Sequence, residues 1–391
     1  MKALRKYIDK IKPNFEEGGK LHAFRSVFDG FETFLFVPNT VTRRGAHVRD
    51  CVDLKRIMIM VVLALVPAML FGIWNTGYQH KLAFGLNDWG FWNMVWYGVV
   101  KVIPLYIVAY VVGLAIEFVS AQINGHEVNE GYLVSGMLIP LIVPVDVPLW
   151  MLAIAVAFAV IIGKEVFGGT GMNIWNPALL TRAFLFFSYP SKMSGDTVWT
   201  GGVARYMADG TAFQCGNGLV DGFSGATPLA NPTLANLEPQ FMDMVLGTIP
   251  GSVGETSVIA ILLGAILLLW TGVASWKIMA SSVIGGLAVG YLGYAVGATD
   301  LPGYYQLVMG GFLFGTVFMA TDPVTSAQTE GGKWIYGFLV GALAVTVRIW
   351  NPGYPEGMML AILLMNTFAP LIDHYVISFS IKRRAKKVTI A

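Results

Sequence analysis

The chain has 391 residues, of which 55% are hydrophobic and only 13% are charged, and its formal net charge is +2 at pH 7. Soluble domains usually carry about 25% charged residues, so the composition excludes a soluble globular protein and indicates an all-α polytopic membrane protein. Two cysteines and five scattered histidines, with no Cys/His cluster, give no reason to expect an iron–sulfur cluster, a disulfide framework or a transition-metal site.

The two ends of the chain are basic. Residues 1–56 hold twelve Lys or Arg and no 20-residue apolar run, so we treat them as a separate N-terminal region. The tail, 379–391, holds five more Lys or Arg. Basic segments that flank membrane spans stay in the cytoplasm. Both termini are therefore predicted to be cytoplasmic, which requires an even number of spans.

Apolar runs near the length that a bilayer demands predict ten spans. The Trp-containing segment 83–100 is expected to lie at the membrane interface instead. The third, fifth and eighth spans are short or end near Pro, Gly or Asp, and broken helices survive at membrane depth only in a cavity wall or a protein interior. The ten spans are placed at 57–73, 101–120, 131–144, 148–165, 176–189, 256–272, 276–297, 306–322, 334–350 and 358–378.

An internal repeat divides these spans. The segment from Asn173 to Pro177 recurs, with one substitution in its Asn-Ile-Trp-Asn-Pro sequence, from Arg348 to Pro352. Five spans in each unit give the two units opposite orientations in the membrane. We therefore predict two inverted repeats, at 57–189 and 256–378, which is typical of transporters whose sites lie at the repeat interface.

The segment 190–255 is the longest hydrophilic stretch between spans. Its only basic residues are Lys192 and Arg205, and ten spans from a cytoplasmic start place it outside the membrane. We expect it to form a periplasmic loop.

This loop contains the sequence Asp-Gly-Phe-Ser-Gly-Ala-Thr at 221–227, which is similar to the motif at which bacterial flavin transferases attach FMN to a threonine through its phosphate. Gly222 and Gly225 would give the backbone the freedom to enter a transferase active site. Ser224 is small enough to leave room for the flavin, and Asp221 could hydrogen-bond the turn or guide the transferase. We expect covalent FMN on Thr227; the alternative is a Gly-rich surface turn.

Three carboxylates lie at or near the ends of apolar spans: Glu117, Asp322 and Asp373. A charge in hydrocarbon costs several kcal/mol, so such residues are functional candidates. Their oxygens, with carbonyls freed by breaks near Pro323 and Pro370, would suit a hard cation. The alternative is an interfacial position where water solvates each carboxylate.

Together, these features resemble the B subunits of bacterial Na+-translocating NADH:quinone oxidoreductases, and the resemblance runs from about residue 15 to residue 384. The related D subunits of Rnf ferredoxin:NAD+ reductases share the flavin motif and the membrane core, but the long N-terminal region favours the quinone reductases. The resemblance is carried by residues 42–44, 47–50, 52–60, 126–131, 164–171, 176–179, 221–227, 319–324, 351–352 and 354–362.

The resemblance implies a urea-transporter-like fold in the bacterial inner membrane. It implies covalent FMN on Thr227, a non-covalent riboflavin in the membrane domain, and electron flow from the FMN of the family's C subunits to a quinone, coupled to Na+ export. Its expected partners are the A, C, D, E and F subunits of a complex of six subunits, a flavin transferase, quinone, Na+ and lipid, but no nucleic acid. Because the sequence has no G-x-G-x-x-G or Walker motif, NADH is expected to bind elsewhere in the complex.

Particular residues match the family's functional positions. Glu117, Asp322 and Asp373 match positions associated with Na+ uptake. Asn173 and Asn176 could hydrogen-bond riboflavin, although Asn176 could instead only cap the helix that Pro177 opens.

A quinone is expected near the cytoplasmic side. Arg43, Arg44 and His47 could frame its head group or could contact lipid. Gly113 stands where the family has a glycine pair associated with quinone access, but Leu114 replaces the second glycine. A passive channel or solute transporter, which an inverted repeat fits equally well, remains the alternative from another class, beside the Rnf-type subunit.

Overall fold

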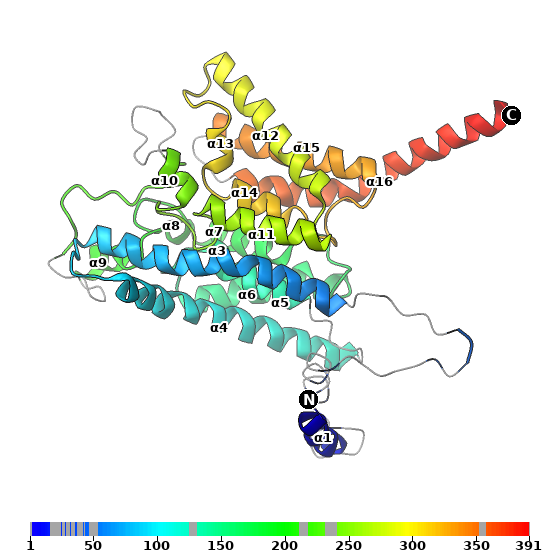
Figure 1. Cartoon of the computed structure of the whole chain (residues 1–391), viewed down its shortest axis with the longest axis horizontal. Coiled ribbons are helices and arrows are strands. Elements are labelled where there is room, and N and C mark those ends of the chain that lie inside the picture. Colours follow the sequence, from blue (N-terminus) through cyan, green and yellow to red (C-terminus); the bar gives the residue numbers. More distant parts are fainter. Residues whose placement is uncertain are drawn as a thin grey trace.

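The computed structural model describes residues 2–15, 54–124, 131–210, 218–230, 241–351 and 357–390, together with isolated positions between 25 and 46. The described elements are all helical, and Figure 1 shows them in chain order. They are α1 (Lys2–Ile11), α3 (Leu54–Ala83), α4 (Phe91–Asn124), α5 (Tyr132–Ile142), α6 (Leu149–Gly163), α7 (Pro177–Ser188), α8 (Pro190–Met193), α9 (Val203–Asp209), α10 (Phe241–Leu246), α11 (Val258–Thr271), α12 (Trp276–Val296), α13 (Tyr305–Val308), α14 (Phe312–Phe314), α15 (Glu330–Trp350) and α16 (Gly357–Ile390), with short 3-10 turns η1 (Lys12–Asn14) and η3 (Glu165–Phe167) and a π-helical turn η5 (Gly315–Met319).

Six of the described helices are long and apolar enough to cross a membrane, and α5, α7 and α11 are shorter apolar helices. This confirms the prediction of an all-α polytopic membrane protein. The helix α4 begins at Phe91, well before the predicted start of the second span at residue 101. The tryptophans Trp92 and Trp96 therefore belong to this helix, and their side chains are 78% and 65% exposed.

Two parts of the helical body are interrupted. The helix α5 ends at Ile142, and an irregular segment containing Pro144 and Pro148 leads to α6. In the second half, α13 and α14 are short and are followed by η5, which ends before Asp322 and Pro323. Proline cannot donate a backbone hydrogen bond within a helix, which explains why regular structure stops at these points.

Glycines let neighbouring helices approach closely. A Cβ added to Gly98 of α4 would lie 1.9 Å from the carbonyl oxygen of Ile73 in α3, and one added to Gly341 of α15 would lie 1.9 Å from the carbonyl oxygen of Ser282 in α12. Small residues at such crossings allow backbone contact that larger side chains would prevent. The pairs α3–α4 and α12–α15 therefore form rigid walls in the two halves.

The elements of the 190–255 segment lie at one end of the helical body. There α9 and α10 stand apart from α16, which projects from the opposite end, where α3 begins (Figure 1). A small cluster fixes the segment to the end of α3, because Ala83 and Phe84 are buried with Val203 of α9. The amide of Val220 also donates to the carbonyl oxygen of Ala83 at 2.9 Å.

Candidate functional site

One cavity contains Thr227 in its wall, and we call it the Thr227 cavity. The empty space between its lining residues, including space that is open to solvent, is about 720 Å³. Its wall comes from α5, α7, the 199 and 227–229 regions, residues 249–256, Gly310 and Gly311, η5, α15 and the start of α16. Both halves of the chain therefore contribute to one site.

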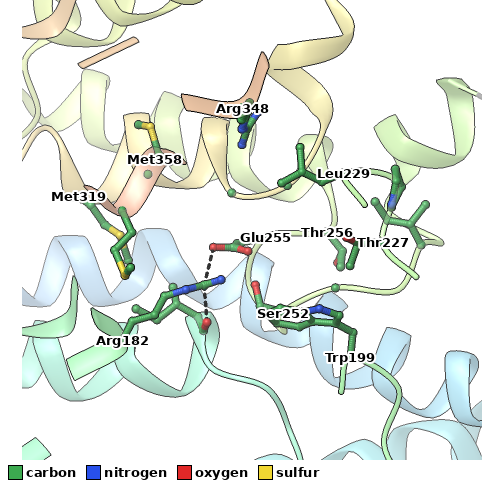
Figure 2. A pocket seen from close by; sticks show the side chains of 18 of the residues that line it. Arg182, Trp199, Thr227, Leu229, Ser252, Glu255, Thr256, Met319, Arg348 and Met358 are labelled. Atoms are coloured by element: carbon green, nitrogen blue, oxygen red, sulfur yellow. Dashed lines mark hydrogen bonds and ion pairs between the residues drawn. The ribbon is translucent and has the colours of Figure 1, made fainter. Parts of the chain in front are cut away.

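The chain directly after Thr227 is anchored in the protein. Thr227 is half-buried, whereas Pro228 and Leu229 are buried. Leu229 packs in a hydrophobic cluster with Met244, Met309 and others. The amide of Ala230 donates to the carbonyl oxygen of Thr227 at 2.9 Å. The hydroxyl of Thr227 is consequently held at one end of the cavity, as Figure 2 shows.

The rest of the 221–227 motif lies nearer the surface. Asp221 and Ser224 are exposed, and the Ser224 hydroxyl accepts a bond from the amide of Ala226 at 3.4 Å. Gly222 has φ +74°, a conformation that favours glycine. Gly225 is buried, and a Cβ there would lie 2.2 Å from the carbonyl oxygen of Asp196. Close packing, in addition to backbone freedom, therefore explains this second glycine.

Three charged side chains line the same cavity. Arg182 of α7 pairs with Glu255 at 3.1 Å, and its Nη1 also donates to the carbonyl oxygen of Ile142, the last residue of α5. Arg348 of α15 donates from Nη1 to the carbonyl oxygen of Gln306 at 2.7 Å. Both arginines are buried. They satisfy carbonyl groups that the interrupted helices leave without a helical partner.

We call a second cavity the Asp322 cavity; the empty space between its lining residues, including space that is open to solvent, is about 760 Å³. It brings together Asn173, Asn176 and Asp322, three residues that the sequence analysis singled out separately. Ser135 and Thr170 add hydroxyl groups, and apolar residues of α3, α5, α11 and η5 complete the wall.

Asn176 and Asp322 are in direct contact. The Nδ2 of Asn176 donates to Oδ2 of Asp322 at 3.3 Å, and the Oδ1 of Asn176 accepts from the amides of Ala178 and Leu179 at 3.0 and 3.4 Å. Asp322 also accepts from the amide of Val324 at 3.1 Å. Asn176 is therefore the N-cap of α7, and it joins that helix to the break after η5.

Glu117 does not line the Asp322 cavity. It forms an ion pair with Lys164, and each of the two side chains is only 4% exposed. Lys164 itself lines the cavity. Glu117 is thus linked to the Asp322 cavity through its partner Lys164.

Asp373 lies elsewhere, in α16, where it contacts the residues just before α15. It accepts from the amides of Gln328 and Thr329 at 2.7 and 3.0 Å, and from the Thr329 hydroxyl at 2.5 Å. The three predicted sodium carboxylates therefore do not form one cluster. Of the candidate quinone residues, Arg44 is exposed, and Arg43 and His47 lie outside the described residues.

Gly113 is buried in α4 against the ring of Tyr132. A Cβ at this position would lie 1.9 Å from the ring carbon Cζ of Tyr132, whose hydroxyl donates to the carbonyl oxygen of Ala109 at 2.8 Å. The structure thus gives Gly113 a packing role, and contact with quinone there stays a prediction.

Replacing Gly113 by alanine is expected to destabilise the protein by about 1–3 kcal/mol, because the Tyr132 ring must move out of its hydrogen-bonded position. Denaturant unfolding in mixed micelles, followed by circular dichroism, measures this change. Gly90→Ala is the matched control, since a Cβ at Gly90 meets nothing within 4 Å. Equal stability of the two variants would contradict the packing role.

The two cavities share a thin wall. Phe318 lines the Asp322 cavity and the next residue, Met319, lines the Thr227 cavity. On α7, Asn176 and Pro177 face the Asp322 cavity, whereas Leu179 and Arg182 face the Thr227 cavity. From Asn176 to Arg182 the helix rises only about 9 Å.

Several of these residues were not predicted from the sequence: Lys164, Arg182, Glu255 and Arg348. A usable signal was present, because Arg182 and Arg348 fall inside the predicted spans 176–189 and 334–350. A charged residue within an apolar span is a functional candidate whatever its sign, so the basic residues deserve the same weight as the carboxylates.

The fold and the two cavities define a polytopic helical membrane protein with two neighbouring cavities among its helices. The chain belongs to the NQR2, RnfD, RnfE family, whose profile matches residues 41–382. It is 44% identical to the B subunit of the Na(+)-translocating NADH-quinone reductase of Ectopseudomonas mendocina, over 97% of this chain and 98% of the relative. It is 42% identical to the protein of the same name from Chromohalobacter salexigens, over 98% of this chain and 96% of the relative.

Proposed function

We propose that the protein is the B-type membrane subunit of a redox-driven sodium pump, a Na+-translocating NADH:quinone oxidoreductase. Its relatives of nearly equal length carry that name, and the family is shared with Rnf subunits. The observation that carries the proposal is the pair of adjacent cavities, one with Thr227 in its wall and one with Asn173, Asn176 and Asp322. A passive channel has no need of an acceptor threonine facing a cavity.

The proposed topology has ten spans in two inverted five-helix repeats, with both termini in the cytoplasm and the 190–255 segment in the periplasm of a bacterial inner membrane. The opposite placement of α9 and α10 relative to the exposed end of α16 supports this topology (Figure 1). The arrangement requires the Thr227 cavity to open on the periplasmic side and the Asp322 cavity to lie nearer the cytoplasm.

The residues of the Thr227 cavity fit a covalently held FMN. Thr227 stands at one end, and Gly310 and Gly311 contribute wall without side chains that would fill the cavity. The Asp322 cavity fits a non-covalent riboflavin, because Asn173, Ser135 and Thr170 can hydrogen-bond a polar ring edge or a ribityl chain. A bound flavin supplies reversible one- and two-electron transfer.

The chain's own residues then have distinct roles. Thr227 would hold one flavin in the first cavity, and Asn173 would contact the second in the other cavity, with α7 and η5 contributing to the walls of both. Asp322 supplies carboxylate oxygens for Na+ in the same cavity that Asn173 lines. Glu117 and Asp373 serve other points of the sodium path. Electrons come from the flavin of a partner protein and leave to quinone near the cytoplasmic side, where Arg43, Arg44, His47 and Gly113 are the candidate contacts.

Replacing Thr227 by alanine is expected to abolish flavin fluorescence of the denatured protein, since only a covalent bond survives denaturing electrophoresis. The test uses in-gel ultraviolet fluorescence and mass spectrometry of the peptide containing residues 221–227, after expression with the flavin transferase and the rest of the complex. Ser224→Ala is the matched control for the neighbouring hydroxyl, and it should remain fluorescent. A dark wild-type band with an unmodified peptide would remove the electron-carrier function and favour a passive transporter. Use of ferredoxin and NAD+ in place of NADH and quinone by the membranes would favour an Rnf-type subunit.

A further inference from the structure

The charged side chains of the Thr227 cavity have no role in the proposed function so far. Arg182, Glu255 and Arg348 lie in its wall, and a charged group inside a membrane protein is costly unless it is used. Part of the explanation is structural, because Nη1 of each arginine donates to a carbonyl of an interrupted helix. Neutral donors could satisfy those carbonyls, so this role does not explain why the groups are cations.

The position of Arg348 relative to the flavin tether is well defined. A Cβ on Gly310 would lie 3.1 Å from Cδ2 of Leu229 and 3.3 Å from Nη2 of Arg348. The space beside Gly310 is therefore bounded by both the Arg348 guanidinium and Leu229, which follows Thr227 by only two positions. Gly310 has φ +57°, so a side chain there would be strained as well as crowded. The glycine keeps this edge of the guanidinium open to the cavity.

The Arg182–Glu255 pair lies next to the neighbouring glycine, Gly311. A Cβ on Gly311 would lie 2.3 Å from Oε1 of Glu255, which is paired with Arg182. Figure 2 shows the order along the cavity: Thr227 and Trp199 at one end, the charged groups in the middle, and Met319 at the far end. A ring that is tethered at Thr227 through a phosphate and a ribityl chain reaches beyond the threonine and toward these charges.

We propose that Arg348, with the Arg182–Glu255 pair, sets the reduction potential of the flavin held on Thr227. This inference rests on the proposed function. A flavin ring gains negative charge when it accepts electrons, so a nearby cation favours its reduction and a nearby carboxylate opposes it. Charges close to a flavin ring tune its electronics, and burial strengthens their effect because water is excluded. Arg348 and Glu255 therefore shift the same midpoint potential in opposite directions.

The test is a spectroelectrochemical titration of the intact complex, from which the titration of the Thr227→Ala complex is subtracted to isolate this flavin. Arg348→Gln is expected to shift its midpoint potential downward, and Glu255→Gln to shift it upward. Arg348→Lys keeps the charge and should stay close to the wild type. Arg205→Gln removes an exposed arginine of α9 from the same loop and is the control, with no expected shift.

Opposite shifts in Arg348→Gln and Glu255→Gln support the proposal, because a merely structural role of these residues gives no such sign pattern. Shifts of the same sign, or no shift while the protein still fluoresces in a denaturing gel, overturn it. In Arg348→Gln, a lower fluorescence anisotropy of the flavin with an unchanged midpoint potential also overturns it. This result would mean that Arg348 binds the flavin's phosphate. If Arg348→Gln does not assemble, the comparison of Arg348→Lys, Glu255→Gln and wild type still shows whether loss of the carboxylate raises the midpoint potential. A wild-type protein without covalent flavin would refute the proposed function itself, which is a separate result.

Discussion

Replacing Lys164 by methionine is expected to destabilise the protein by about 3–5 kcal/mol, the largest stability effect among the changes considered. Lys164 and Glu117 are each 4% exposed, so the methionine variant leaves a buried carboxylate without its partner. Breaking a buried ion pair from one side has a cost of this size because the remaining charge is neither hydrated nor compensated. Unfolding in mixed micelles, followed by circular dichroism, measures it.

The double variant Lys164→Met with Glu117→Gln tests the reason for this loss. It carries no buried charge at the pair, so it should recover most of the stability that Lys164→Met loses. Lys277→Met is the matched control, because Lys277 pairs with Glu330, whose side chain is 66% exposed, and such pairs contribute at most about 1 kcal/mol. If the double variant is as unstable as the single one, the ion pair is not the cause.

The same variants also test the role of Glu117 in the sodium path. A carboxylate that is already paired with an ammonium group has less to offer a monovalent cation. We therefore expect the double variant, compared with the wild type, to change the Na+ dependence of quinone reduction less than a change at Asp322 does. Measuring the reaction rate against Na+ concentration in both variants decides which carboxylate the sodium path depends on.

The parts of the fold that depend on local composition could be predicted from the sequence. Apolar runs located α3, α6, α11 and α12, because the need for about 20 apolar residues acts on each segment separately. Helix ends were less accurate, as the start of α4 at Phe91 shows: its first turns carry polar and aromatic residues that lower the apolar signal. The motif at 221–227 and the breaks near Pro323 were visible because short, unusual sequences mark them.

The contacts that build the cavities could not be predicted, since they join residues that are distant along the chain. Asn176 and Asp322 were assigned to different ligands, yet they share one hydrogen bond across 146 positions. The pairing of Glu117 with Lys164 and of Arg182 with Glu255 likewise depends on how helices from different parts of the chain pack. A sequence read in isolation shows which residues are unusual, but the packing of helices decides which of them meet.

Replacing Asp322 by asparagine is expected to raise the Na+ concentration for half-maximal quinone reduction at least about tenfold, which corresponds to about 1.4 kcal/mol of lost binding energy. The variant removes the negative charge from the Asp322 cavity while it nearly preserves the shape of the side chain. It also loses a hydrogen bond. Asn176 cannot turn its amide around, because Oδ1 already accepts from the amides of Ala178 and Leu179. The new side chain at 322 can turn its single oxygen either toward Asn176 or toward the amide of Val324, and its NH2 group then faces the other donor.

Exchanging the two residues separates the effect of charge from the effect of this hydrogen bond. In the double variant Asn176→Asp with Asp322→Asn, the new carboxylate at 176 still accepts from the helix amides, as an N-cap aspartate does. Its second oxygen accepts from the new amide at 322. The bond between the two side chains and the bonds from the helix amides are thus retained, and the charge moves by only one side chain. The Thr325 hydroxyl, which now donates to Asp322, would instead accept from the new amide. We expect the double variant to unfold like the wild type and to recover part of the Na+ affinity, whereas Asp322→Asn alone recovers neither.

The control for this exchange is Asp300→Asn, which changes an exposed carboxylate after α12 and should leave the Na+ dependence as it is. An exchange variant that is stable but has the weak Na+ dependence of Asp322→Asn would mean that the carboxylate must stand at position 322 itself, as a direct ligand requires. If neither variant alters the Na+ dependence, then Asp322 only connects α7 to the chain after η5, and the sodium path lies elsewhere in the protein.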